Sequence, residues 1–258
     1  MPPEPVRLVV PCYDEEARLP ADRFAAFAAR HPEVSFLFVD DGSRDGTAAR
    51  LDALAARLGA QGRVLGLPRN RGKAFAVRAG VQAICADPPG GCFGYWDADL
   101  ATPLEELEPL REALRERPEA VLALGSRVKL LGRAIERSTL RHYPGRVFAT
   151  CASLVLGLPV YDTQCGAKLF RDGAETRALF AEPFGVGWTF DVELLARLIA
   201  ARRGSDAPPV ERSVIEVPLR VWSDPGGSKV RPLDFLTSLW ELWRLHRRYF
   251  GGRPGAGR

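Results

Sequence analysis

Two motifs that would place the chain in a familiar nucleotide-binding class are missing from its 258 residues. There is no Gly-x-x-x-x-Gly-Lys-Ser/Thr motif, which excludes a P-loop nucleotidase, and no Gly-x-Gly-x-x-Gly follows the first apolar run. A large excess of one charge is also lacking, because 36 Lys and Arg against 32 Asp and Glu leave a net charge of only +4. So mild a balance does not indicate nucleic acid, and we expect no nucleic-acid partner.

Paired cysteines and long apolar runs are scarce as well. The five cysteines form no Cys-x-x-Cys pair and are odd in number, which is typical of reduced thiols in a cytosolic protein and argues against a zinc site. The longest stretch without charge, 147–161, contains Gly157 and Pro159 and is shorter than the ~18 residues of a membrane-spanning helix. The first apolar run is too short for a signal peptide. We expect a cytoplasmic protein, with at most a peripheral position on the inner face of the membrane.

The first half of the chain alternates short β-rich runs with helical patterns. The expected strands are 7–11, 34–40, 63–67, 92–97 and 120–126, and the expected helices are 21–31, 46–59, 73–86 and 103–117. Such alternation predicts right-handed βαβ units and therefore a mainly parallel sheet with helices on both faces. Ligands of such sheets bind at the carboxyl ends of the strands.

The second half is less regular. We expect helices at 147–156, 189–203 and 232–249, a strand at 213–222, and a hairpin or short strand at 162–172. A glycine-rich loop covers 223–230, and the composition of 251–258 predicts a disordered tail.

Polar side chains follow four successive strands of the predicted sheet. Each group alone is typical of a turn or a helix cap. Four such groups at one sheet edge favour a binding site instead. The groups are Asp14, Glu15 and Glu16; Asp40 and Asp41; Asn70, Gly72 and Lys73; and Asp97 and Asp99.

The last of these groups places two carboxylates close together. Residues i and i+2 of an extended segment lie on the same side, so Asp97 and Asp99 repel each other unless a cation lies between them. Mg²⁺ is commonly bound by one or two carboxylates together with substrate phosphates. The spacing therefore predicts a site for Mg²⁺ or Mn²⁺ that binds the diphosphate of a nucleotide.

Six segments then carry a resemblance: VVPCYDEEARLP, FLFVDDGSRDGT, NRGKAFAVRAGV, YWDADLATP, GSRV and VWSDPGGSKV. Their order resembles the inverting GT-A glycosyltransferases of family 2, and most closely the dolichyl- or polyprenyl-phosphate glucosyltransferases and mannosyltransferases, the glucosyl branch above all. The resemblance implies a GT-A fold with a Rossmann-like, mainly parallel central sheet flanked by helices. It implies a GT-A domain over 1–230, with a nucleotide-binding half (1–126) and an acceptor half (127–230), followed by an amphipathic helix over 231–250 and the tail 251–258.

The resemblance also implies roles for individual residues. Asp97 and Asp99 would be the DxD pair that binds Mg²⁺ or Mn²⁺, with Asp97 also near the sugar and ribose. Arg127 and Lys229 would bind phosphate groups in the reaction. The nucleotide-binding residues would be Pro11, Tyr13, Glu15 and Asp41 around the base and ribose, with Asp40 beside them, and Asn70, Gly72 and Lys73 at the border of the nucleotide.

The expected activity is the inverting transfer of a hexose, glucose by the closest branch, from a nucleotide diphosphate sugar such as UDP-glucose to a polyprenyl or dolichyl phosphate. Transfer to a soluble hydroxyl acceptor and a non-catalytic nucleotide-sugar binding module stay open as alternatives. A hydroxyl acceptor needs a general base, for which Asp191 is the candidate. Asp191 and Glu193 also suit a second interpretation, stabilisation of a helix N-terminus.

Basic residues of the second half indicate an anionic partner or a solvated face. Lys129, Arg133, Arg137 and Arg141 recur every four residues and would form one cationic stripe on a helix. In the last helix, Leu236, Leu239, Trp240 and Trp243 share a face, and arginines follow near its end. This pattern suits a peripheral membrane contact or packing on the domain equally well.

Overall fold

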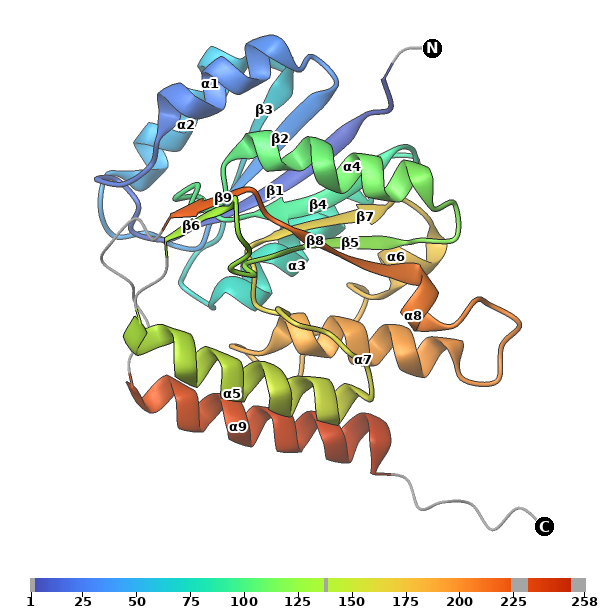
Figure 1. Ribbon diagram of the computed structural model, residues 1–258. Coiled ribbons are helices and arrows are strands. Elements are labelled where there is room, and N and C mark those ends of the chain that lie inside the picture. Colours follow the sequence, from blue (N-terminus) through green and yellow to red (C-terminus); the bar gives the residue numbers. More distant parts are fainter. Residues whose placement is uncertain (1–2, 137–138, 224–231, 252–258) are drawn as a thin grey trace, which may run out of the picture.

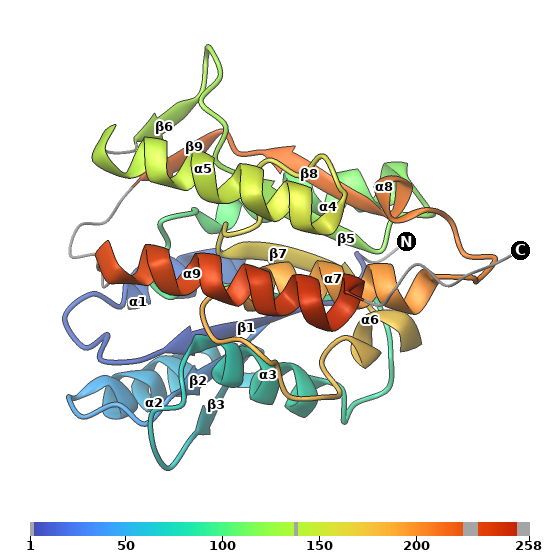
Figure 2. The same cartoon turned by 90° about the horizontal axis from the view of Figure 1, so that it is seen from below.

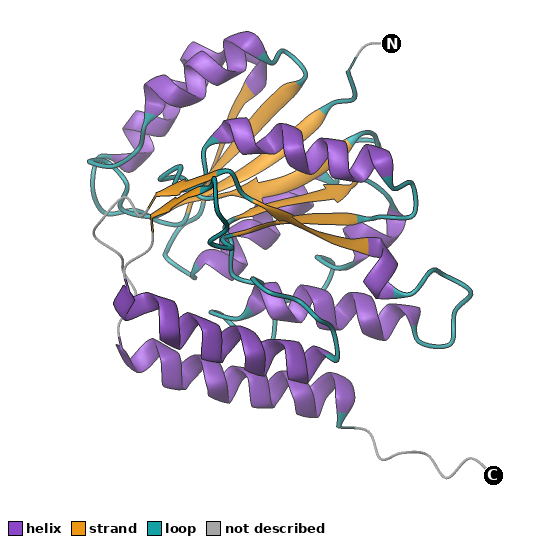
Figure 3. Cartoon of the chain, viewed as in Figure 1, coloured by secondary structure: helices purple, strands orange, loops and turns teal. Residues whose placement is uncertain are grey.

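The computed structural model describes residues 3–136, 139–223 and 232–251 and contains a central seven-stranded sheet in the order β3-β2-β1-β4-β7-β5-β8 (Figures 1 and 3). The strand β7 is antiparallel to both of its neighbours, β4 and β5, and the other pairings in this sheet are parallel. The strands are β1 (Val6–Cys12), β2 (Val34–Asp40), β3 (Gly62–Gly66), β4 (Cys92–Trp96), β5 (Leu122–Ser126), β7 (Ala167–Arg171) and β8 (Val214–Pro218).

Helices cover both faces of this sheet. On one face lie α1 (Ala21–Arg30), α2 (Thr47–Leu58) and α4 (Leu107–Glu116). On the other face lie α3 (Lys73–Ile84) and α7 (Phe190–Arg202), and α5 (Thr139–Leu156) and α9 (Pro232–Leu245) pack outside α7 (Figure 2). Because helices shield both sides, every residue of β4 and β5 is buried. The expected α/β architecture is confirmed.

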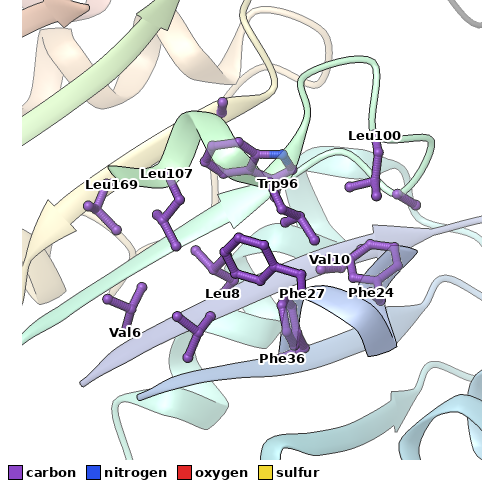
Figure 4. Close-up of a cluster of buried hydrophobic side chains, with 14 of the residues drawn as sticks. Val6, Leu8, Val10, Phe24, Phe27, Phe36, Trp96, Leu100, Leu107 and Leu169 are labelled. Atoms are coloured by element: carbon purple, nitrogen blue, oxygen red, sulfur yellow. The ribbon is translucent and has the colours of Figure 1, made fainter. Parts of the chain in front are cut away.

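Aromatic side chains fill the core between β1, β2 and α1. Phe24 of α1 packs edge-on against Phe36 and Phe38 of β2, with ring centroids 5.4 and 5.2 Å apart. Figure 4 shows the same cluster with Trp96 at the end of β4 and Leu100 just beyond it. The core thus extends directly beneath the end of β4, where the two neighbouring carboxylates lie.

The strands and helices expected in the first half are confirmed, with ends that shift by up to a few residues. The second half differs more. The expected strand 213–222 is two strands, β8 and β9 (Val221–Ser223), because the Glu106 carboxylate accepts hydrogen bonds from the backbone N–H groups of Arg220 and Val221 (3.1 and 3.0 Å) and turns the chain there. The last helix ends in a π-helical turn, η3 (His246–Phe250), and residues 252–258 of the expected tail lie outside the described residues.

The expected cationic stripe is wrong. Lys129 and Arg133 lie in the loop before a short strand, β6 (Ala134–Glu136), which pairs with β9, whereas Arg141 belongs to α5. Arg137 lies outside the described residues. The four-residue spacing therefore does not lie on one helix, since β6 makes the segment extended. The remaining short elements are α6 (Ala174–Ala178), α8 (Val210–Ser213), and the 3₁₀ turns η1 (Gly59–Gln61) and η2 (Leu104–Glu106).

None of the helices in the described part of the chain combines the length and the apolar character that a membrane span requires.

The residue after the carboxylate pair, Leu100, has an unusual backbone. Its φ is +50°, a left-handed conformation that costs a residue with a Cβ atom ~1–2 kcal/mol. Its side chain is only 2% exposed and packs in the cluster of Figure 4. Burial of this side chain therefore holds the backbone turn that follows Asp99.

Substitutions of Leu100 separate these two effects. Leu100→Ala keeps the Cβ and loses most of the buried side chain, so the free energy of unfolding should fall by about 2–5 kcal/mol. Leu100→Gly relieves the left-handed strain, and we expect it to be at least as stable as Leu100→Ala. Urea denaturation measures both. The same two substitutions at buried Leu110 of α4 are the control. There the glycine variant should be less stable than the alanine variant by ~1 kcal/mol, because glycine disfavours a helix. The same ranking at Leu100 would contradict the role of its backbone.

Candidate active site

The carboxyl ends of β1, β2 and β4 meet at the point where the strand order reverses, which is where open α/β sheets bind ligands. Pro11 lies in β1, Asp40 ends β2, and Asp97 follows β4 directly. Lys73 begins α3, and its Nζ is 2.5 Å from Oδ1 of Asp97. The fold therefore brings residues of these three predicted groups to one sheet edge, and the fourth group, at 14–16, follows β1 at the same edge.

Lys73, Asp97 and Asp99 form the charged centre of this site. The side chains of Lys73 and Asp97 are 39% and 35% exposed, so the pair is open to a ligand. Partial burial of Lys73 acts to lower its pKa. The neighbouring carboxylates of Asp97, Asp191 and Asp99 together have the larger effect, so the pKa of Lys73 is raised. Burial and the charge of Asp97 raise the pKa of Asp99, whose Oδ1 accepts a hydrogen bond from the backbone N–H of Ala101 (3.0 Å).

The donor set fits a divalent cation that is shared with a substrate. Within 3–136, 139–223 and 232–251, no group of three or more His, Cys, Asp or Glu side chains forms a complete metal site. Asp97 and Asp99 supply two carboxylates, and Mg²⁺ commonly completes such a set with water and substrate phosphates. The residues present therefore suit Mg²⁺ or Mn²⁺ bound together with a diphosphate.

A glycine that the sequence motifs did not single out makes room for Asp97. A Cβ atom on Gly166 would overlap the Asp97 carboxylate, and the carbonyl of Gly166 accepts a hydrogen bond from the backbone N–H of Asp97 (3.0 Å). Gly166 directly precedes β7, which pairs with β4. The position of the carboxylate therefore depends on a strand that comes much later in the chain.

Asp41 shapes the loop that carries Asn70, Gly72 and Lys73. It is buried, and its two carboxylate oxygens accept hydrogen bonds from the backbone N–H groups of Arg71 (2.9 Å) and Gly72 (2.7 Å). Burial, and then the neighbouring charge of Asp40, raise the pKa of Asp41. Asn70 is exposed at the tip of this loop.

The loop after β1 is held against the loop after β2. Glu15 donates its backbone N–H to the Thr47 hydroxyl (2.8 Å), and its carboxylate accepts from Arg18. Asp14 accepts a hydrogen bond from the backbone N–H of Arg44 (2.9 Å). Tyr13, in the loop after β1, is half-buried. The contacts fix the positions of the residues predicted to surround the base and ribose.

A buried ion pair lies behind the carboxylate pair. The Lys168 Nζ is 2.6 Å from Oδ1 of Asp191, and the Tyr95 hydroxyl donates a hydrogen bond to the same oxygen. The Lys168 and Asp191 side chains are 1% and 5% exposed. Lys168 also donates to the carbonyl of Cys165 (2.6 Å). Burial and the charge of Asp191 raise the pKa of Tyr95 well above its ordinary value.

This network was missed at the sequence level. One signal was present, because Lys168 is a charged residue inside the apolar run AKLF of an expected strand. A lysine in a buried strand requires an acidic partner, and Asp191 of α7 supplies it. Asp191, predicted as a candidate general base, is therefore an ion-paired carboxylate close enough to raise the pKa of Lys73.

Arg127 follows β5 and forms a bidentate ion pair. Its Nε and a terminal guanidinium nitrogen donate to Asp162 at 2.7 and 2.8 Å, and its backbone N–H donates to the same carboxylate (3.0 Å). Burial acts to lower the pKa of Arg127. The charges of Asp162 and also of Asp97 have the larger effect and raise this pKa above its ordinary value. Arg127 is thus a fixed cation within electrostatic reach of Asp97. Lys229, the other predicted phosphate ligand, lies outside the described residues.

Comparisons with known proteins give matches over most of the chain. Residues 8–175 match the model of the family "Glycosyl transferase family 2". A dolichyl-phosphate beta-glucosyltransferase of Trichomonas vaginalis is 34% identical, over 86% of this chain and 65% of that protein. A dolichyl-phosphate beta-glucosyltransferase of Drosophila melanogaster is also 34% identical, over 95% of this chain and 75% of that protein.

Solved structures show the same fold. The glucosyl-3-phosphoglycerate synthase of Mycobacterium tuberculosis in complex with Mn²⁺ and UDP-glucose superimposes with a TM-score of 0.65 and 19% identity, covering 99% of this chain and 82% of that one. At this identity the likeness establishes the fold alone.

Gly166→Ala tests whether the space beside β7 positions Asp97. The added methyl group should displace the carboxylate and lower the affinity for UDP with Mn²⁺ roughly tenfold or more, as changes to groups that orient metal ligands do. Titration calorimetry measures the affinity. Gly173→Ala is the matched control, because a Cβ there meets nothing within 4 Å. Equal affinities in both variants would contradict the importance of the Asp97 position.

Proposed function

Since the chain belongs to glycosyltransferase family 2 and is a glycosyltransferase with the GT-A fold, we propose that it transfers glucose from UDP-glucose to a polyprenyl phosphate such as dolichyl phosphate. The named activity of the curated relatives supports this choice of sugar and acceptor. The observation that carries the proposal is the open cluster of Lys73, Asp97 and Asp99 at the carboxyl end of β4, which suits a cation-bound nucleotide diphosphate.

On the donor side, Asp97 and Asp99 would hold Mg²⁺ or Mn²⁺, which when bound supplies positive charge for the departing diphosphate. Lys73 adds a fixed cation next to Asp97. Asp41 keeps the 69–72 loop closed beside the nucleotide through its hydrogen bonds to Arg71 and Gly72. An acceptor that attacks from the side opposite the leaving group inverts the anomeric configuration in one displacement.

On the acceptor side, the state of Asp191 favours a phosphate over a hydroxyl. A phosphate monoester has its second pKa near ~6, so it is a nucleophile at neutral pH without a base. A sugar hydroxyl needs a general base. Asp191 is buried, and one of its oxygens already accepts from both Lys168 and Tyr95, so it is poorly arranged to accept a proton from an incoming acceptor. Arg127, which Asp162 holds in place, would contribute its positive charge to binding of the acceptor phosphate.

Metal dependence is tested with Asp99→Asn. We expect the variant to keep its melting temperature, because asparagine has nearly the same size as aspartate. It should lose most of its transfer activity, because the substitution removes the charge of a predicted metal ligand. EDTA should abolish wild-type activity, and Mn²⁺ or Mg²⁺ should restore it. Asp22→Asn, in which an exposed carboxylate of α1 loses its charge, should remain fully active. Full turnover of the wild type in EDTA would overturn the role of Asp97 and Asp99.

The acceptor class is tested by removing charges on each side. For a phosphate acceptor, Arg127→Ala and Lys229→Ala should each cripple transfer to a short-chain polyprenyl phosphate. Asp191→Asn alone would leave the buried Lys168 without a counter-ion, at a cost of roughly 3–5 kcal/mol in stability. The double variant Asp191→Asn/Lys168→Met removes both charges, and we expect it to retain transfer within about tenfold of the wild type.

The alternative predicts the opposite result. If Asp191 were a general base for a hydroxyl acceptor, the double variant would lose about 10²–10⁴-fold in rate while Arg127→Ala had a smaller effect. Thermal melts of each variant separate these outcomes from loss of folding. Absence of transfer by the wild type to any polyprenyl phosphate, together with Asp191-dependent transfer to a soluble hydroxyl compound, would overturn the proposal.

A further inference from the structure

The outer helices α5 and α9 lie side by side on the face of the molecule away from the sheet (Figures 1 and 2). Both expose large apolar side chains on this α5–α9 face. The exposed fractions are 52% and 77% for Val147 and Leu154 of α5, and 63%, 54% and 52% for Leu236, Trp240 and Trp243 of α9. Single exposed apolar residues are ordinary, but a group of this size on two adjacent helices marks an interaction surface.

Among the side chains that the structure describes on these helices, the exposed charges are all positive. Among the described side chains of α5, α9 and η3, the exposed ionised groups are Arg244, Arg247 and Arg248. The acidic residue described there, Glu241, is 7% exposed and points inward. Its carboxylate accepts hydrogen bonds from the backbone N–H groups of Gly187 (3.0 Å) and Thr189 (2.8 Å). The face is therefore apolar and cationic, which is complementary to an anionic amphipathic partner.

Two arginines lie over the two tryptophans. The Arg244 guanidinium lies 4.8 Å from the Trp240 ring, and Arg247 lies 4.9 Å from the Trp243 ring. Tryptophan is enriched where hydrocarbon meets lipid headgroups, and basic residues next to it attract anionic headgroups. A groove of about 420 Å³ beside these pairs is lined by both tryptophans and by Arg244, Arg247 and Arg248, with Gly185 and Val186 on its other side.

We propose that the α5–α9 face docks on the surface of a bilayer that contains anionic phospholipids. Trp240 and Trp243 enter the headgroup region, and Arg244 and Arg247 bind headgroup phosphates. Further apolar contact comes from Val147, Leu154 and Leu236. A second copy of the chain fits this face less well, because a two-fold symmetric contact would bring like charges together. The inference does not depend on which acceptor the enzyme uses.

Vesicle flotation of the full chain tests the docking surface. The wild type should float with vesicles of phosphatidylcholine and phosphatidylglycerol, less with phosphatidylcholine alone, and less at high salt. Arg244→Gln/Arg247→Gln should lower the partition coefficient roughly 30-fold, since each basic residue near an anionic surface contributes ~1 kcal/mol. Trp240→Ala/Trp243→Ala should lower it on both vesicle types.

The matched control is Arg115→Gln/Arg117→Gln, which removes the same net charge from exposed residues at the end of α4, on the opposite face of the sheet. It should partition within about twofold of the wild type. Charges on the far face are screened from the bilayer surface, so their removal should change binding little. Equal losses in both arginine variants, or a wild type that stays unbound to the anionic vesicles, would overturn the proposal.

Two further measurements distinguish lipid docking from self-association and from a role of this face in the chemical step. A wild-type dimer that dissociates in the tryptophan variant during sedimentation would show that the face joins copies of the chain, and would overturn lipid docking. Transfer to a short, water-soluble prenyl phosphate without vesicles should be the same in the wild type and the face variants. If the wild type floats with vesicles but never transfers glucose, the proposed reaction fails and the docking surface stands.

Discussion

The place of β7 between β4 and β5, which puts Lys168 against Asp191, is the constraint on which the site depends. An ammonium group in a central strand is tolerated only with a carboxylate within reach, so β7, α7 and the Tyr95 end of β4 must meet in one arrangement. A shift of β7 by one residue would turn Lys168 to the other face of the sheet. It would also move Gly166 from its place beside Asp97. The register of one antiparallel strand thus sets both the buried ion pair and the position of a predicted metal ligand.

Much of the fold could be predicted because its signals are local. The alternation of apolar strands and amphipathic helices in the first half is visible within short windows, and the polar residues at the strand ends follow directly from it. The motifs around Asp41, Lys73, Asp97 and Asp99 then indicated the family, which the comparisons confirm. That Lys73 and Asp97 lie at one sheet edge follows from the rule that parallel strands end together, but their ion pair was not predicted.

What could not be predicted depends on contacts between distant segments. The place of β7 between β4 and β5, and with it the roles of Gly166 and Lys168, is fixed by pairing across the sheet. The basic residues from Lys129 to Arg141 have a helical spacing, but pairing of β6 with β9 makes part of that segment extended. Asp191 looked equally suited to a helix start and to a base, and only its contact with Lys168 shows how its charge is balanced.

Glu241 connects the outer helix α9 to the helix that carries Asp191. It ties α9 to the loop that leads into α7, and Asp191 lies two residues beyond Thr189, the last residue that Glu241 binds. A shift of α9 would therefore pull on the N-terminus of the helix that carries Asp191. Thermodynamic linkage makes any such coupling symmetric. If occupancy of the outer face changes the affinity for nucleotide, nucleotide must change the affinity of that face by the same factor.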